Sequence, residues 1–356
     1  NGVIHVIDTV LMPPSMMMAE EEMMDEEMDD EMMDEGMMMP SVIYATSNPA
    51  DLENDAIYGL TPDLMDTMLT FNGFAEGITS VESIAFAADG TAYLTVDTGD
   101  GSGSLVGVPD LGNMSDSMML ADGEMMMTEG LTAPKGLQVV DELGLVIVAD
   151  FGANAIVVFD RDLNMMGSVD NLGGDRSIWD VYHDVDTDTL YATGTDGVLL
   201  AYEGFSSAMG VDGPTRMIIP ADADGNQISV NLHGISYYAA NDELILTDVG
   251  DAGSAEDGQL FVITDGSTAD GNTTVSVQIG GPESMLGNPV DVVYDGAYAY
   301  VAEKSNDAVL RFDDLLSMDM MGMMGDAAPA LMIEVLKAES VALPADSMMS
   351  EGMMDG

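Results

Sequence analysis

The chain of 356 residues contains no cysteine, only 7 lysine and arginine residues, 3 histidines and a single tryptophan. Without cysteine, no disulfide framework is available. So few cations exclude nucleic acid as a partner, because phosphate binding needs clustered positive charge, and they disfavour docking onto an anionic membrane. No apolar run reaches the roughly 18 residues that a membrane-spanning helix needs, so we expect no membrane insertion.

Negative charge and methionine are what the chain has in excess. The 65 aspartate and glutamate residues leave a formal net charge of -58, and there are 35 methionines. Such a charge keeps a protein soluble, repels other copies of it and attracts cations. High salt or an extracellular setting rich in divalent ions would both suit this composition.

Methionine and acidic residues dominate two tracts, residues 15–39 and 347–356, neither of which contains a cation. Like charges repel and extend such a tract, and it lacks branched or aromatic side chains for a core, which predicts a linker at 15–39 and an acidic tail at 347–356. Methionine thioethers can bind Cu(I). However, these tracts contain no histidine and their carboxylates favour hard cations, so we favour an adhesive linker over a copper site.

Between these tracts, one unit of short apolar strands separated by acidic, glycine-containing or polar turns recurs along the chain. Its clearest copy is residues 134–160, and others begin near residues 81, 178, 232 and 289. The copies follow one another at about 45 to 57 residues without helical periodicity, which is typical of β-propeller blades. A β-sandwich is the alternative, but the regular spacing of similar units argues against it.

The two ends of this region complement each other. AESVALPAD at residues 338–346 resembles VESIAFAAD at 81–89, yet the chain nearly ends after it, while residues 41–62 read as the rest of a blade. We therefore predict an all-β fold, a six-bladed propeller over residues 40–346, whose C-terminal strand joins the N-terminal blade and closes the ring. The repeats resemble those of NHL and lactonase-like propellers.

The first 14 residues, NGVIHVIDTVLMPP, resemble the closing motif of the fasciclin domain and depart from it mainly at Met12. Fasciclin domains are adhesion modules, so the resemblance implies an extracellular or cell-surface location. Either the segment is a remnant, or it is a detached strand that adds to a sheet edge of another copy, head to tail, and so builds a filament. The residues expected to donate this strand are Val3, Ile4, Val6, Ile7 and Val10.

Aligning the copies places polar residues at the start of each innermost strand, where side chains converge on one mouth of the central channel. These candidates are Glu82, Lys135, Trp179, Asp180, His233, Asp291 and Glu339. By analogy with lactonase-like propellers, such a channel could hold a divalent cation that activates water. A merely polar channel is the alternative, and glycines at positions 136 and 234 favour packing there.

Two acidic loops offer clustered oxygens, the ligands that Ca²⁺ prefers. The candidate ligands are Asp222, Asp224, Asn226, Asp248, Asp251 and Asp257. Chance clusters are expected among 65 acidic residues, and weak collective cation binding is the simpler interpretation.

The sequence favours a secreted or cell-surface structural and binding protein that self-associates head to tail through strand donation and cation-bridged acidic faces. One alternative is a metal-dependent, lactonase-like hydrolase with its site at the channel mouth. A second alternative is a propeller that binds a ligand without catalysis.

Overall fold

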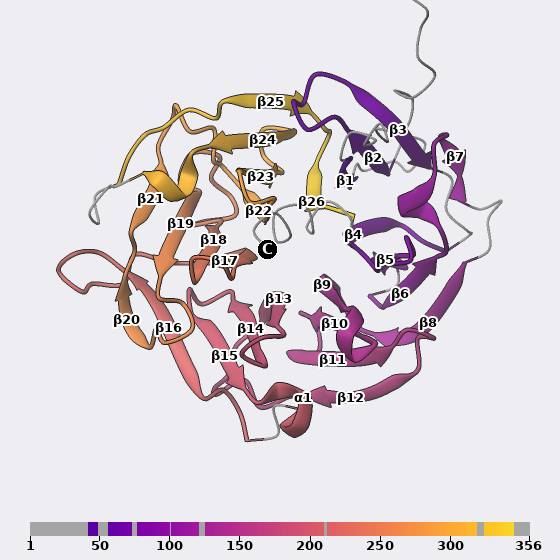
Figure 1. Ribbon diagram of the computed structural model, residues 1–356, viewed down its shortest axis with the longest axis horizontal. Coiled ribbons are helices and arrows are strands. Elements are labelled where there is room, and N and C mark those ends of the chain that lie inside the picture. The colour runs from indigo at the N-terminus through magenta and orange to yellow at the C-terminus, as the bar shows by residue number, and fades with distance from the viewer. Residues whose placement is uncertain are drawn as a thin grey trace, which may run out of the picture. The chain divides into compact units, whose positions relative to one another are not determined.

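The computed structural model describes residues 42–48, 56–72, 77–99, 101–120, 125–209, 212–318 and 324–344. Over these residues the chain forms six sheets arranged around a central axis (Figure 1). The predicted all-β fold and the six-bladed propeller are confirmed. The segments 1–14, 15–39 and 347–356 lie outside the described residues, so their predicted roles stay predictions.

Each blade has its innermost strand beside the axis, and its strands follow outward in order (Figure 1). The first blade contains β26 (Ala338–Ala342), β1 (Ile43–Ser47), β2 (Ile57–Leu60), β3 (Thr67–Asn72) and β7 (Met118–Met119). The second contains β4 (Ser80–Phe86), β5 (Ala92–Asp97), β6 (Gly103–Val108) and β8 (Met126–Leu131). The third contains β9 (Pro134–Val140), β10 (Leu145–Asp150), β11 (Ala155–Asp160) and β12 (Met165–Val169).

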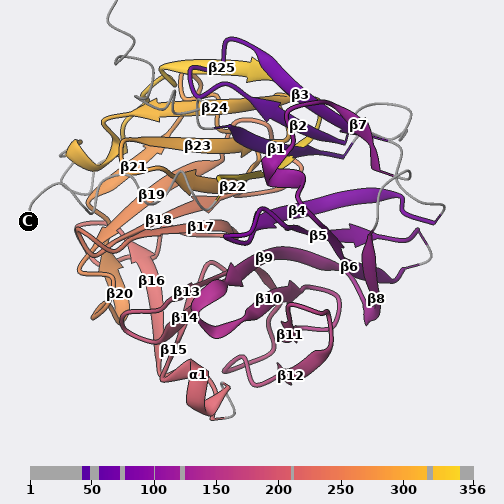
Figure 2. The same cartoon turned by 45° about the vertical axis from the view of Figure 1, so that its right-hand side comes forward.

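The remaining blades follow the same plan. The fourth contains β13 (Ile178–Asp184), β14 (Thr189–Gly194), β15 (Leu199–Glu203), β16 (Arg216–Ala221) and β20 (Gly271–Thr274). The fifth contains β17 (Leu232–Tyr238), β18 (Glu243–Asp248), β19 (Gln259–Thr264) and β21 (Val277–Gly280). The sixth contains β22 (Pro289–Tyr294), β23 (Tyr298–Glu303), β24 (Ala308–Asp313) and β25 (Leu331–Glu334), which run alongside one another in Figure 2.

Helical structure in the described part of the chain is confined to single turns. They are α1 (Phe205–Ala208), η2 (Leu111–Asn113), η4 (Asp141–Leu143) and η5 (Leu315–Ser317). None of these helices is long and apolar enough to cross a membrane.

The position of a strand within its blade explains its pattern of residues. The middle strands β10 (LVIVAD) and β11 (AIVVFD) are almost continuously apolar and buried, because blades stack against both of their faces. The outermost strand β25 alternates partly buried and exposed positions, as expected for a strand with one face in solvent. Burial therefore decreases from the middle strands to the rim.

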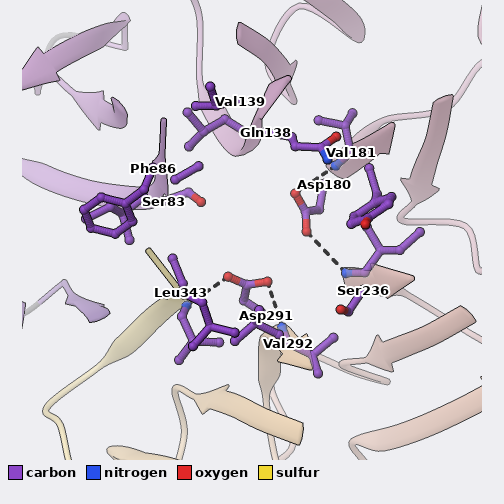
Figure 3. Close-up of a pocket in the computed structure, with 18 of the residues that line it drawn as sticks. Ser83, Phe86, Gln138, Val139, Asp180, Val181, Ser236, Asp291, Val292 and Leu343 are labelled. Carbon is purple, nitrogen blue, oxygen red and sulfur yellow. Dashed lines mark hydrogen bonds between the residues drawn. The ribbon is translucent and has the colours of Figure 1, made fainter. Parts of the chain in front are cut away.

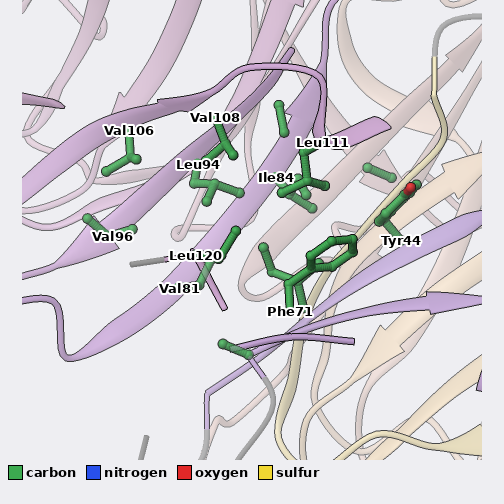
Figure 4. Close-up of a cluster of buried hydrophobic side chains, with 14 of the residues drawn as sticks. Tyr44, Phe71, Val81, Ile84, Leu94, Val96, Val106, Val108, Leu111 and Leu120 are labelled. Atoms are coloured by element: carbon green, nitrogen blue, oxygen red, sulfur yellow. The ribbon is translucent and has the colours of Figure 1, made fainter. Parts of the chain in front are cut away.

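The core lies between neighbouring blades. Tyr44 and Phe71 of the first blade stack with ring centroids 6.5 Å apart and belong to one buried cluster with Val81 and Ile84 of the second blade (Figure 4). Each such cluster joins residues that are distant along the chain, so the ring holds together by contacts between its sheets.

The ring closes as predicted, with β26 beside β1 (Figure 1). The two strands pair antiparallel, and Val341 lies opposite Ala45 in their register. The backbone N–H of Asn48 also donates to the carbonyl oxygen of Lys337, at 3.0 Å. The first blade is thus built from both ends of the described chain.

Two blades carry a fifth strand that the repeat did not predict. β7 pairs parallel with β3, and β20 pairs parallel with β16. Both strands come from the long connection between the third and the outermost strand of the following blade, β6–β8 and β19–β21, where the sequence period offers no guide.

Candidate functional site

The innermost strands share an irregularity near their start. The register between each innermost strand and its neighbour shifts there. On four innermost strands the shift lies at Val81–Ser83, Ile178–Val181, Leu232–Ile235 and Pro289–Asp291. For β9 and β26 it lies opposite Val148–Asp150 of β10 and Thr46–Ser47 of β1. A β-bulge re-aims a side chain locally. This explains how consecutive residues such as Trp179 and Asp180 can both contribute to the channel.

Six side chains at this end of the channel form what we call the mouth cluster. Its members are Glu82, Lys135, Trp179, His233, Lys304 and Glu339. Lys135 is ion-paired with Glu82, and the Nζ atom of Lys304 lies 2.5 Å from Oε2 of Glu339. The Trp179 and His233 rings stack with centroids 3.7 Å apart, and the Nζ atom of Lys135 lies 5.1 Å from the Trp179 ring centroid.

The structure therefore brings together five of the predicted site residues. Glu82, His233 and Glu339 are each only 3 to 4% exposed, so the cluster fills this end of the channel. Both glutamates face lysines instead of converging on one vacant position. The carboxylates of Glu82 and Glu339 are paired with lysines, and the other two predicted residues, Asp180 and Asp291, lie outside this cluster.

Burial and neighbouring charges set the protonation of the mouth cluster. Burial raises the pKa of Glu339 to about 7, although Lys304 opposes the shift. Burial also raises the pKa of Glu82, but Lys135 outweighs that effect and holds it below its usual value. Burial, together with Lys135 and Lys304, lowers the pKa of His233 well below its usual value. At neutral pH, His233 is therefore uncharged.

We expect Glu339→Gln to flatten the dependence of stability on pH. Glu339 has a pKa of about 7 in the folded chain, against an ordinary value of 4.5, so between these values the folded state holds a proton that the unfolded state has released. The wild type should therefore lose about 3 kcal/mol of unfolding free energy through this group as the pH rises from 4.5 to above 7.

Urea denaturation at pH 5 and pH 8 measures this difference. The exposed Glu334 on β25 supplies the control, Glu334→Gln, which should keep the wild-type slope. His233 contributes to the pH dependence of stability with the opposite sign, but its contribution is the same in all three proteins and cancels from the comparison. An equal slope in Glu339→Gln and the wild type would contradict the prediction.

Beyond the mouth cluster, the innermost strands enclose a cavity of about 350 Å³ (Figure 3). All six blades contribute to its lining, which we call the central cavity. The lining extends to Ala88 and Glu142, which are exposed at the far end of the strands. The central cavity therefore opens to solvent at the end opposite the mouth cluster.

Asp180 and Asp291 point into the central cavity from β13 and β22 (Figure 3). Asp180 accepts hydrogen bonds from the backbone N–H of Val181 at 2.8 Å and of Ile235 at 3.2 Å. Asp291 accepts from the N–H of Val292 at 2.7 Å. It also accepts from the N–H of Val341 at 3.0 Å and from the hydroxyl of Ser340 at 2.6 Å.

Two glycines make room for these carboxylates. A Cβ on Gly136 would lie 1.9 Å from Oδ1 of Asp180, and a Cβ on Gly234 would lie 2.5 Å from the Cα of Asp291. On the sequence alone, these glycines favour packing over a site. They do allow close packing, but what packs there is the pair of acidic residues.

Both aspartates are harder to ionise than exposed ones. Burial and the negative charge of Asp291 raise the pKa of Asp180 well above its usual value. Burial raises the pKa of Asp291 to about 6. Among the ion pairs of the described residues, none includes either aspartate. The central cavity thus holds two carboxyl groups with no cation beside them.

The remaining lining is partly apolar and aromatic. Phe86, Tyr182, Tyr237 and Tyr294 lie around the half of the central cavity toward its opening. Ser236 also lines it, and its hydroxyl accepts a hydrogen bond from the backbone N–H of Tyr294 at 3.2 Å. A ligand entering here would meet aromatic walls first and the two aspartates at the far end.

Sequence reasoning missed Lys304 and the aromatic walls. Lys304 follows β23, the second strand of its blade, whereas all the channel-mouth residues predicted from the sequence lie on innermost strands. A signal was available, because the chain contains only three lysines.

The predicted calcium ligands lie outside the lining of the central cavity, in two loops and, for Asp248, at the end of β18. Asp222 accepts from the backbone N–H groups of Asp224 at 2.9 Å and Asn226 at 2.8 Å. Asp248 accepts from three backbone N–H groups, and Asp257 from the N–H of Asp251. No group of three or more acidic, histidine or cysteine side chains in the described ranges is placed to hold a metal ion. Calcium binding stays a prediction.

Comparison with known proteins gives the fold. No family model matches the chain, and no curated protein matches it. A chain of a nidogen/laminin complex is 13% identical, with 85% of this chain and 97% of that chain covered and a TM-score of 0.55. A putative 6-phosphogluconolactonase from Bacteroides fragilis is 11% identical, with 87% and 99% covered and a TM-score of 0.55.

A protein from Lactobacillus plantarum is likewise similar, at 15% identity, with 86% and 99% covered and a TM-score of 0.53. These similarities confirm the likeness to lactonase-like propellers at the level of the fold. The fasciclin resemblance of residues 1–14 stays a prediction.

Proposed function

We propose that the propeller is a ligand-binding module that takes a small molecule into its central cavity. The observation that carries this proposal is a solvent-open cavity of about 350 Å³ with two buried carboxyl groups pointing into it. Binding sites are typically concave and mostly apolar, with a few convergent polar groups and perturbed pKa values. The central cavity has each of these features.

The hydrolase alternative has less support. A metal-dependent site at the mouth would need Glu82, His233 and Glu339 to converge on an ion. Both glutamates are instead paired with lysines, and His233 stacks on Trp179. Similarity to putative lactonases at identities of 11 and 14% supports the fold and carries no activity over to this chain.

Filling the central cavity tests the binding proposal. We expect Ser236→Phe to abolish binding of small aromatic probes, because Ser236 lines the cavity, while the control Ser236→Ala should retain it. Ligand-observed NMR with benzylamine, benzyl alcohol and benzoate is the measurement. Binding of a probe to the wild type that persists in Ser236→Phe, or no binding of any probe, would contradict the proposal.

A second proposal concerns assembly, and exposed methionines on the outermost strands favour it. Met127 on β8, Met165 on β12 and Met332 on β25 are 48 to 61% exposed. These strands are sheet edges over the described residues, and a sheet edge can pair with an added strand. We propose that residues 1–14 of a second copy add there, in a secreted or cell-surface setting, and build head-to-tail filaments.

A net charge of -58 opposes such assembly unless ions screen it, since the Debye length is about 8 Å at physiological salt. Divalent cations such as Ca²⁺, bridging acidic faces, would supply that screening. Electron microscopy should show filaments that EDTA disperses and that deletion of residues 1–14 abolishes. Separate particles in the wild type with added Ca²⁺ would rule out the assembly proposal.

A further inference from the structure

The two aspartates in the central cavity have unused hydrogen-bond acceptor capacity. An ionised carboxylate offers about four acceptor positions. Asp180 uses two, for Val181 and Ile235, and Asp291 uses three, for Val292, Val341 and Ser340. About three acceptor positions therefore remain between the two side chains. A primary ammonium group has three N–H donors and no acceptor.

The charge of the cavity also favours a ligand that carries an ammonium group. Ionising two buried carboxyl groups with no cation beside them is costly, and a positive charge placed between them offsets that cost at low dielectric. The net charge of -58 also attracts cations to the molecule from solution. An anionic ligand would add to the repulsion.

An organic cation suits the central cavity better than a metal ion does. Ca²⁺ takes six to eight oxygen ligands, whereas the described residues offer no third acidic or histidine side chain grouped with Asp180 and Asp291 to hold a metal. Backbone N–H groups already hold both carboxylates in place. The walls of Phe86 and three tyrosines would accommodate an apolar or aromatic body behind the charged group.

We infer that the ligand of the central cavity is a primary amine with an aromatic or aliphatic body, its ammonium group bound between Asp180 and Asp291. This inference rests on the proposed binding function and names the class of ligand. The ammonium group donates to both carboxylates, and the body lies toward the open end, among the aromatic side chains.

Isothermal titration at pH 8 with three probes that share one aromatic body tests this assignment. Benzylamine carries charge and N–H donors, benzyl(trimethyl)ammonium carries charge alone, and benzyl alcohol carries neither the charge nor the N–H donors. We expect benzylamine to bind at least about tenfold more tightly than either of the others, since charge-assisted hydrogen bonds are the stronger kind.

Asp180→Asn and Asp291→Asn should each weaken benzylamine at least about tenfold and leave benzyl alcohol nearly unchanged. Asp186→Asn, at an exposed position of the β13–β14 turn, is the matched control. If the asparagine variants fail to fold, the comparison of the three probes on the wild type still decides.

Benzylamine and benzyl alcohol binding equally to the wild type would overturn the amine assignment and leave the central cavity as a binding site. Binding of neither in the cavity would overturn both proposals. Benzylamine binding that resists Asp180→Asn, Asp291→Asn and Ser236→Phe together would place the amine on the acidic surface instead, and would equally overturn the assignment.

Discussion

Replacing Gly234 by alanine is expected to lower the free energy of unfolding by about 3 kcal/mol, the upper end of what overpacking a core costs. The new Cβ would lie 2.5 Å from the Cα of Asp291 and 2.7 Å from the N of Val292. Both are backbone atoms of β22, the innermost strand of the next blade, and no side-chain rotation can relieve the contact. β17 and β22 would have to move apart.

A glycine elsewhere in the ring gives the matched control. Gly167 on the outer strand β12 has nothing within 4 Å of an added Cβ, so Gly167→Ala should change stability little. Urea denaturation of both variants measures the difference, and a shared transition midpoint would contradict the account of the channel. Because Asp291 moves with its backbone, Gly234→Ala should also weaken benzylamine binding.

Deleting the closing strand is expected to have the largest effect of all. A chain that stops after Leu336 lacks β26, which pairs with β1 and carries Glu339 of the mouth cluster. Loss of the buried Val341 and Leu343 alone should cost about 5 kcal/mol. That is comparable to the whole stability of many domains, so the truncated chain should lose its cooperative unfolding transition.

A chain that stops after Pro344 is the control for this truncation, because it keeps β26 and removes only residues 345–356. Thermal unfolding followed by circular dichroism compares the two. Cooperative unfolding of the shorter chain, at the temperature of the longer one, would show that the ring does not depend on its closing strand.

The sequence was sufficient to predict the fold and much of the mouth cluster, for physical reasons. Each blade repeats the same turn chemistry and strand spacing, so aligning the copies placed Glu82, Lys135, Trp179, His233 and Glu339 at equivalent points around the axis. Closure could be predicted because AESVALPAD has the pattern of an innermost strand without a blade of its own.

What the sequence could not give was how neighbouring blades interact. The partner of Glu339 is Lys304, which follows a second strand instead of lying on an innermost one. The close approach of Gly136 to the carboxyl group of Asp180 depends on the distance between two blades, which no local sequence pattern encodes. The parallel strands β7 and β20 likewise follow from tertiary contacts in long connections.

The central claim is that Asp180 and Asp291 hold a ligand cation in the central cavity. A crystal structure of the protein soaked with benzylamine tests it most directly. The account predicts the nitrogen at about 2.7 to 2.9 Å from an oxygen of each aspartate, with the ring toward Tyr237 and Tyr294. Benzylamine bound only at the outer acidic surface, with the two carboxyl groups uncontacted, would contradict it.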